Sequence, residues 1–169
     1  MAEVNLLPAY LINGEDQLKR ETVLKRLRSR LEAMGDLDFN CDTFDGKDAL
    51  GGDIVAAFNT MPFGIDKRLV IVRNADDLKK ADSEALVAYL ASPADFTVLA
   101  LLANKLAKNT RLYKAAAAVG PKAVIDCAPR KAYELPSQVR AMATSHGIAM
   151  TDSAAKLLVE LVGEDTVHL

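Results

Sequence analysis

The chain has 169 residues, of which 50% are hydrophobic, and its formal net charge is −2. This length can bury one main core and begin a second, and the charge gives no global attraction to nucleic acid. The start lacks a cationic segment followed by a long apolar run, and no later stretch approaches the ~20 apolar residues of a membrane helix. We therefore expect a soluble, cytoplasmic protein.

Short β-rich runs alternate with helical patterns through most of the chain, which predicts an α/β fold with a parallel sheet covered by helices. The predicted strands are Ala9–Asn13, Asp38–Phe44, Arg68–Arg73, Phe96–Leu102 and Ala123–Cys127. Three of them are nearly unbroken apolar runs, as in strands that are covered on both faces. The stretch DFNCDTF alternates instead, with Phe39, Cys41 and Thr43 on one side, and this pattern predicts a strand at the sheet edge.

Helical spacing separates the strands. The first helix places Leu24, Leu27, Leu31 and Met34 on one face and is predicted to end near Gly35. Further helices are predicted over Ile54–Asn59, Ser83–Leu90 and Lys108–Val119.

The alternation stops after Pro129, where Pro136–His146 and Ser153–Val162 have the pattern of two amphipathic helices. We predict an α/β domain over residues 1–129 and the beginning of a small helical domain over residues 130–169. Because a lone helix pair exposes an apolar face, we expect the chain to be a fragment of a longer protein.

The turn after the first strand lies where nucleotide-binding proteins of this architecture hold phosphate. A phosphate loop needs G-x-x-x-x-G-K-[ST], but counting from Gly14 the chain has Lys19, Arg20 and Glu21 in the last three places. Glu15 and Asp16 would also repel a phosphate. We predict a turn in the right position that binds no nucleotide, and hence no cofactor.

Other catalytic and metal-binding patterns fail as well. The third strand ends with Arg73 and Asn74 where a Mg²⁺-dependent hydrolase has an acidic pair, and we interpret the later Asp76 and Asp77 as helix-capping residues. The sequence has no G-x-S-x-G motif, and its cysteines have no metal-ligand spacing. The prediction is a protein with no catalytic residues and no metal site, which binds rather than catalyses.

Two features could mediate binding. The connection before the third strand carries Met61, Pro62, Phe63 and Ile65, which either pack against their own domain or anchor a partner. Further on, basic residues recur at every third position and would share one helical stripe that contacts DNA, an acidic partner or only solvent. These residues are Lys105, Lys108, Arg111 and Lys114.

In their order and spacing, four stretches together resemble the delta subunit family of the bacterial DNA polymerase III clamp loader. They are YLINGEDQL, NTMPFGIDKRLVIVRNAD, FTVLALLANKLAKNTRLYKA and LVGEDTVHL. The resemblance implies an AAA+-like five-stranded parallel sheet without ATP-binding motifs, a helical lid domain that begins at residue 130, and a C-terminal collar domain that lies beyond this chain.

The resemblance also implies a role in DNA replication within the DNA polymerase III holoenzyme, a nucleotidyltransferase. The delta subunit binds the sliding clamp, the beta subunit, through an apolar loop and holds one ring interface open for loading onto primed DNA. Its other partners are the gamma/tau and delta prime subunits. Carried over, the contact falls on Met61, Pro62, Phe63 and Ile65. Family members commonly have two large apolar residues in succession there, whereas Gly64 follows Phe63 here.

Three other functions compete with this one. A nucleotide hydrolase with an atypical loop would be stabilised by ATP. A flavodoxin-like or receiver-type domain would carry clustered acidic residues at strand ends, where this chain has Arg73 and Asn104. A nucleic-acid-binding module using the basic stripe would lose affinity steeply with salt.

Overall fold

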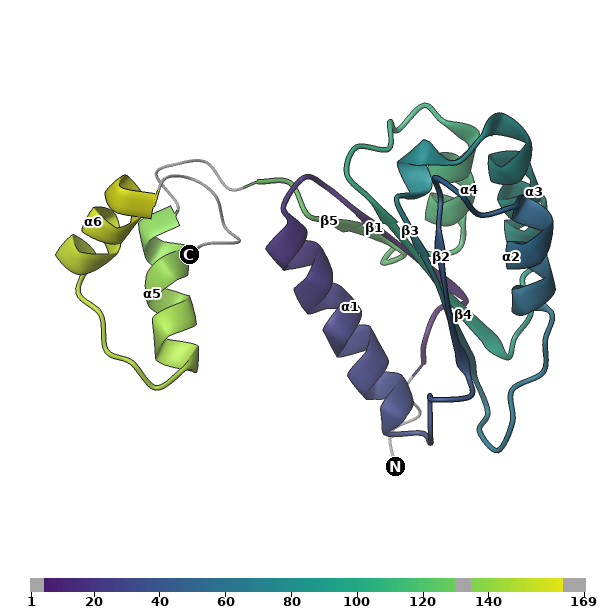
Figure 1. Cartoon of the computed structure of the whole chain (residues 1–169), viewed down its shortest axis with the longest axis horizontal. Helices are drawn as coiled ribbons and strands as arrows, with labels where there is room; N and C mark the ends of the chain where they lie inside the picture. Colours follow the sequence, from purple (N-terminus) through teal and green to yellow (C-terminus); the bar gives the residue numbers. More distant parts are fainter. Residues whose placement is uncertain (1–4, 130–134, 163–169) are drawn as a thin grey trace.

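The computed structural model describes residues 5–129 and 135–162 of the chain. One sheet of five parallel strands forms its centre, in the order β2-β3-β4-β1-β5 (Figure 1). The strands are β1 (Ala9–Asn13), β2 (Cys41–Asp45), β3 (Arg68–Arg73), β4 (Thr97–Ala103) and β5 (Val124–Asp126). The predicted α/β class and parallel sheet are confirmed, and β2 lies at an edge as its sequence pattern predicted.

Helices cover both faces of the sheet. They are α1 (Gln17–Glu32), α2 (Gly51–Phe58), α3 (Lys80–Leu90) and α4 (Arg111–Ala118), with a short 3₁₀ turn η1 (Ala75–Asp77) after β3. Along β3, Leu69 and Ile71 belong to the apolar cluster that includes α1, whereas Val70 and Val72 belong to the cluster that includes α2, α3 and α4. This burial on both faces explains why β3 is an unbroken apolar run.

Strand β2 begins three residues later than predicted because the preceding residues form a turn. The Oδ1 atom of Asp36 accepts a hydrogen bond from the backbone N–H of Asp38 at 2.8 Å, and the N–H of Asn40 donates to the carbonyl of Leu37 at 2.9 Å. Phe39 therefore precedes the strand and does not share a strand face with Cys41 and Thr43. That part of the prediction was wrong.

The helical pair beyond the sheet consists of α5 (Leu135–Ser145) and α6 (Asp152–Val162). Arg140 on α5 and Asp152 at the start of α6 form an ion pair at 2.6 Å. Both helices lie where the sequence predicted them, and their assignment to a lid domain stays a prediction. Within the described residues, no helix is long and apolar enough to cross a membrane.

Candidate functional site

The candidate site is the loop of residues 59–67, between α2 and β3, which we call the apolar loop. It leads into the amino end of β3. The turn of residues 36–40 leads into the amino end of β2, which pairs with β3 in parallel. The apolar loop and this turn therefore meet at the amino ends of the strands, and the β1–α1 turn lies at the opposite end of the sheet, where the strands have their carboxyl ends (Figure 1).

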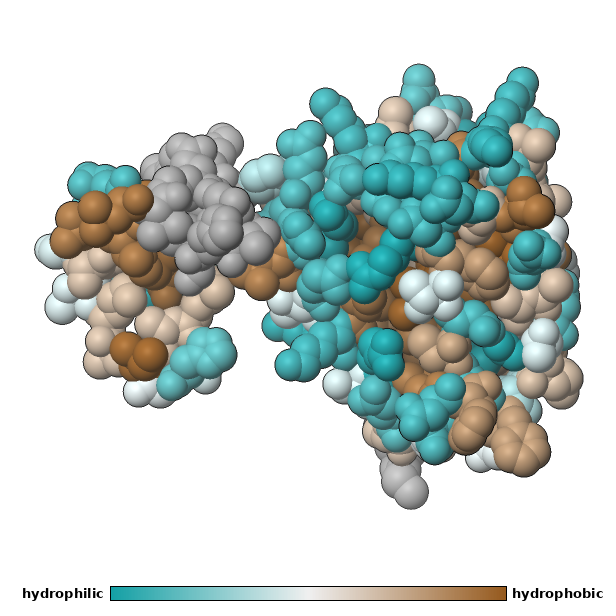
Figure 2. All heavy atoms as spheres, viewed as in Figure 1, coloured by the Kyte–Doolittle hydropathy of each residue, from teal (hydrophilic) through white to brown (hydrophobic). Residues whose placement is uncertain are grey.

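The apolar loop exposes two of its four apolar residues. Met61 is 70% exposed and Phe63 is 81% exposed, although neither carries a polar group. Pro62 is half-buried, and Ile65 packs against the cluster around α1, where it touches the turn at Gly35. Apolar side chains reach the surface at this end of the domain (Figure 2). Met61 and Phe63 are thus free to contact another molecule, whereas Ile65 attaches the loop to the apolar cluster that includes α1.

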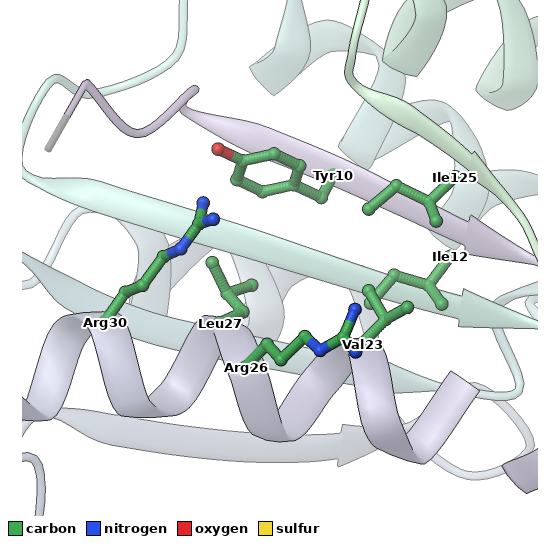
Figure 3. Close-up of a pocket in the computed structure, with 7 residues that line it drawn as sticks. All are labelled: Tyr10, Ile12, Val23, Arg26, Leu27, Arg30 and Ile125. Carbon is green, nitrogen blue, oxygen red and sulfur yellow. The ribbon is translucent and has the colours of Figure 1, made fainter. Parts of the chain in front are cut away.

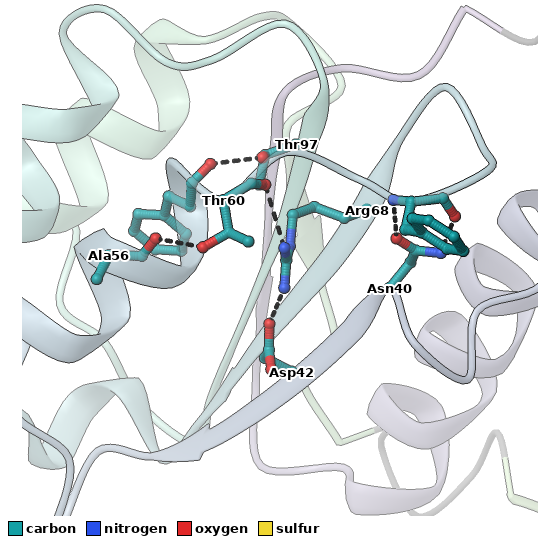
Figure 4. Close-up of polar contacts among 8 residues, drawn as sticks. Asn40, Asp42, Ala56, Thr60, Arg68 and Thr97 are labelled. Atoms are coloured by element: carbon teal, nitrogen blue, oxygen red, sulfur yellow. Dashed lines mark hydrogen bonds and ion pairs between the residues drawn. The ribbon is translucent and has the colours of Figure 1, made fainter.

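Asn40 holds the apolar loop at Phe63. Its side chain accepts a hydrogen bond from the Phe63 N–H at 2.7 Å and donates one to the Phe63 carbonyl at 2.9 Å. The same amide also donates to the carbonyl of Asp36 at 3.0 Å, and the residue is only 2% exposed. Figure 4 shows this amide facing the loop backbone. One buried side chain therefore joins the turn before β2 to the apolar loop.

Other polar contacts fix the beginning of the loop (Figure 4). Arg68 is buried, forms an ion pair with Asp42 on β2, and donates to the Thr60 carbonyl at 3.1 Å. The Thr97 hydroxyl donates to the Phe58 carbonyl at 2.7 Å. Because the chain is bonded at Phe58, directly before the loop, and at Thr60 and Phe63 within it, Met61 and Phe63 are exposed on an ordered backbone.

Gly64 provides the turn that directs the chain from Phe63 back to Ile65. Its φ is +72°, in the left-handed region that favours glycine, and an added Cβ would meet no atom within 4 Å. The glycine is therefore needed for backbone conformation rather than for space. It stands where a second large apolar residue was expected, and a bulky residue would be strained there.

Two residues near this site were missed from the sequence. Phe39 was placed on a strand face, but it is 80% exposed on the turn that Asn40 ends. Asn40 itself reads as an ordinary strand residue. The signal that could have found them is D-x-D-F-N over Asp36–Asn40, because aspartate and asparagine favour side-chain-to-backbone turns over strand pairing.

At the carboxyl ends of the strands, the turn between β1 and α1 is too short to surround a phosphate. It comprises only residues 14–16, with Asp16 as the N-cap that accepts from the Lys19 N–H at 3.0 Å. Gly14 has φ +149°, and a Cβ there would collide with the backbone of Cys127. The Arg20 guanidinium donates to the Gly14 carbonyl. The backbone is thus folded onto its own domain rather than open to an anion.

An ion pair occupies the position where a nucleotide site would bind metal. Glu21 stands in place of the metal-binding hydroxyl, and Arg73 stands in place of the acidic strand end. The guanidinium of Arg73 donates to both carboxylate oxygens of Glu21. This hydrogen bonding lowers the pKa of Glu21 and raises that of Arg73. Glu21 and Arg73 are each unsuited to a nucleotide-binding site, and in this protein they stabilise each other's charge.

The acidic residues after β3 do not cap their own turn as predicted. Asp76 accepts hydrogen bonds from the backbone N–H groups of Asn104 and Lys105, at 3.3 and 3.2 Å, and so links the ends of β3 and β4. Asp77 lies beside it in η1. Among the described residues, no group of three or more His, Cys, Asp and Glu side chains could hold a metal ion.

The basic residues after β4 do not form one helical stripe. Lys105 and Lys108 lie in the loop before α4, which begins at Arg111 after an N-cap at Thr110. Arg111 and Lys114 lie on the helix, and Arg111 pairs with Glu84 of α3 at 3.2 Å. All four basic side chains are exposed. Contact with DNA or an acidic partner stays a prediction for them, without the predicted helical geometry.

A small hollow lies between α1 and the β1–β5 side of the sheet (Figure 3). It is lined by Tyr10, Ile12, Val23, Arg26, Leu27, Arg30 and Ile125. Its volume of about 220 Å³ is below the usual range for small-molecule sites, ~300–1,000 Å³.

Comparison with known proteins identifies relatives of the whole arrangement. A family model described as DNA polymerase III, delta subunit, matches residues 10–127. The DNA polymerase III subunit delta of Bacillus subtilis is 33% identical over 118 residues, which cover 64% of this chain and 34% of that protein. The solved structure of the B. subtilis DNA clamp loader delta protein matches with a TM-score of 0.73 and 28% identity, over 96% of this chain and 50% of that one.

More distant structures share the fold alone. A gamma subunit-related protein of Thermotoga maritima matches with a TM-score of 0.57 and 19% identity, over 80% of this chain and 46% of that one. The RuvB branch migration motor of the same organism matches at 0.53 and 17%, over 89% and 48%. The AAA+-like architecture is confirmed by these likenesses. The chain spans about a third of the length of its curated relative and half of the length of the solved delta protein. Because the family model matches most of its residues, the chain belongs to the DNA polymerase III delta subunit family.

Proposed function

We propose that this chain contains the clamp-binding part of a clamp-loader delta subunit, and that Met61 and Phe63 are its main contacts with the sliding clamp. The observation that carries the proposal is the apolar loop. In a member of this family, two large apolar side chains are exposed on a backbone that Asn40 and Arg68 hold in place.

Ordering of the loop before binding supports this function. Immobilising flexible segments opposes association, so a loop that is already bonded in place loses less conformational entropy when it binds. Pro62 and Ile65 serve the same end, because both are partly buried and fix the loop between the two exposed residues and the sheet. In the proposal, Ile65 supports the contact and Met61 completes it.

The proposed mechanism uses binding energy without nucleotide chemistry. The turn of residues 14–16 is short and lacks the residues of a phosphate loop, and Glu21 and Arg73 pair with each other where such a site would have a hydroxyl and an acidic group. We infer that ATP-binding sister subunits, gamma/tau, drive loading onto primed DNA, while this subunit and delta prime complete the assembly. Opening of the clamp is then the result of binding one side of a ring interface more tightly when that interface is open.

The test is calorimetric titration of this chain with the sliding clamp of the same organism, beside a Phe63→Ala variant. A fully buried Phe side chain contributes about 2–3 kcal/mol in transfer free energy, so the variant should bind at least about 30-fold more weakly. Leu50→Ala is the matched control, because Leu50 is also exposed but precedes α2 at the other end of the sheet, where the strands have their carboxyl ends.

Circular dichroism distinguishes the two interpretations of Phe63. Loss of binding in a folded Phe63→Ala variant supports the proposal. Unfolding of that variant would instead show that Phe63 stabilises the domain. A folded parent chain that does not bind the clamp would contradict the proposal as a whole.

A further inference from the structure

We propose that Phe39 is a second aromatic contact of the clamp-binding surface, beside Phe63. The inference rests on the proposed function, since it concerns the same partner, and it adds a residue from a different connection of the fold. The surface then consists of Phe39, Met61 and Phe63, and the partner that we assign to it is an apolar surface of the sliding clamp.

The first step in the argument is the exposure of Phe39. The chain has five Phe residues, and Phe58 is completely buried while Phe44 packs against the same apolar cluster. Phe96 is half-buried and directly precedes β4. Phe39 and Phe63 stand apart from these three because both are about four-fifths exposed. A single exposed apolar residue needs no explanation, but a group of them on one part of the surface indicates an interaction site.

The second step is the physical link between the two residues. Asn40 follows Phe39 in the chain, and its side chain makes two hydrogen bonds to the backbone of Phe63. These bonds hold the turn that carries Phe39 against the backbone of Phe63, although 23 positions separate Asn40 from Phe63. Met61 lies two residues before Phe63 in the same loop. We infer that the three exposed side chains belong to one surface, because the turn and the loop that carry them are bonded to each other.

The third step is the order of the turn that carries Phe39. Leu37 anchors it in the core, and the Asp36 carboxylate and the Leu37 carbonyl each accept a backbone hydrogen bond within it. The carbonyl of Asn40 accepts from the N–H of Leu69 at 2.8 Å, which fixes the turn to β3. Phe39 is thus presented by a backbone as ordered as the apolar loop, so its burial by a partner would order little beyond its own side chain.

This surface also accounts for Gly64. The family resemblance implies two large apolar residues in succession, whereas the left-handed backbone at Gly64 would strain a bulky residue there. Phe39 offers the missing bulk from the neighbouring turn. The surface would then keep two large groups while the apolar loop retains its sharp turn.

The experiment is titration of the clamp with Phe39→Ala, Phe63→Ala, the double variant and the Leu50→Ala control. Phe39→Ala should weaken binding about 10-fold or more, and Leu50→Ala should change it less than about 2-fold. Circular dichroism and urea unfolding should show no change for Phe39→Ala, because its side chain packs against little of its own domain.

A crosslinking measurement removes any dependence on folding stability. Replacement of Phe39 by the photo-crosslinker p-benzoylphenylalanine should give a crosslink to the clamp, and the same replacement at Leu50 should not. If the parent chain binds but Phe39→Ala binds equally well and no crosslink forms, the inference is overturned while the proposed function stands. If the parent chain does not bind at all, both fail together.

Discussion

At the residue scale, Asn40 connects the fold to the candidate site. The position needs a donor and an acceptor on one short side chain, since Phe63 presents an N–H and a carbonyl to it. Aspartate would lack the donor, and alanine would lack both groups. Because Asn40 is buried, the backbone groups that it bonds have little access to water as a substitute.

We therefore expect Asn40→Ala to lower the free energy of unfolding by about 1–3 kcal/mol, the usual cost of leaving buried polar groups without partners. Clamp binding should weaken as well, because the apolar loop would no longer be held to the turn before β2. Urea unfolding and calorimetric titration measure the two effects.

Asn59→Ala is the control for this variant. Asn59 also uses its amide to bond a backbone carbonyl, that of Val55 at 3.0 Å, but it is exposed. Its replacement should change stability by less than about 0.5 kcal/mol. Equal effects of the two substitutions would show that the Asn40 amide has no special role in holding the loop.

At the scale of elements, sequence reasoning succeeded where burial determines the pattern. Strands β1 and β3 were predicted with their observed bounds, because both faces of β3 and most of β1 are buried and the apolar runs mark them directly. It failed where side chains bond the backbone. The turn at Asp36 shortened β2, and the Thr110 N-cap moved the start of α4 to Arg111, which removed the basic stripe.

Prediction of the candidate site divided in the same way. The exposed loop was found from apolar residues in a connection between elements. Its partner turn was missed, because pairing between Asn40 and Phe63 depends on the parallel contact of β2 and β3, which no local pattern records. The Glu21–Arg73 pair had the same origin. Both residues were identified as wrong for a nucleotide site, but their contact required the fold.

The ion pair between α1 and β3 makes a pH-dependent contribution to stability. Hydrogen bonding to Arg73 lowers the pKa of Glu21 in the folded state. The stabilisation is therefore complete above the ordinary glutamate pKa of about 4.3 and is lost as pH falls through the lower, folded-state value. Both side chains are about two-fifths exposed, so solvent screening should limit the contribution to less than about 1 kcal/mol.

Glu21→Gln should accordingly lower the free energy of unfolding at pH 7, and the difference from the parent chain should shrink as pH is lowered toward about 3. Urea unfolding across this range measures it. Glu32→Gln, which disrupts the longer 3.8 Å pair with Arg28, should have the smaller effect at pH 7. A difference that stays constant with pH would contradict the assignment.

At the scale of the whole molecule, the amino ends and the carboxyl ends of the strands carry different features. At the carboxyl ends of the strands, where this architecture holds nucleotide, the chain has a short turn and the Glu21–Arg73 ion pair. The connections that lead into the amino ends of β2 and β3 carry the exposed residues Phe39, Met61 and Phe63. The residues that form both apolar clusters lie between Leu6 and Cys127, so the sheet domain has a core of its own.

This arrangement predicts that residues 1–129 fold and bind the clamp without α5 and α6. The surface that we propose lies on connections into β2 and β3, and its supporting bonds come from Asn40, Arg68 and Thr97, all within the sheet domain. A chain ending at Pro129 should therefore show a cooperative urea transition and bind the clamp within about 3-fold of the longer chain, a difference of less than 1 kcal/mol. Titration of both chains measures this. If the shorter chain unfolds cooperatively but binds much more weakly, the helical pair contributes directly to the clamp contact, and the interface extends beyond the amino ends of the strands.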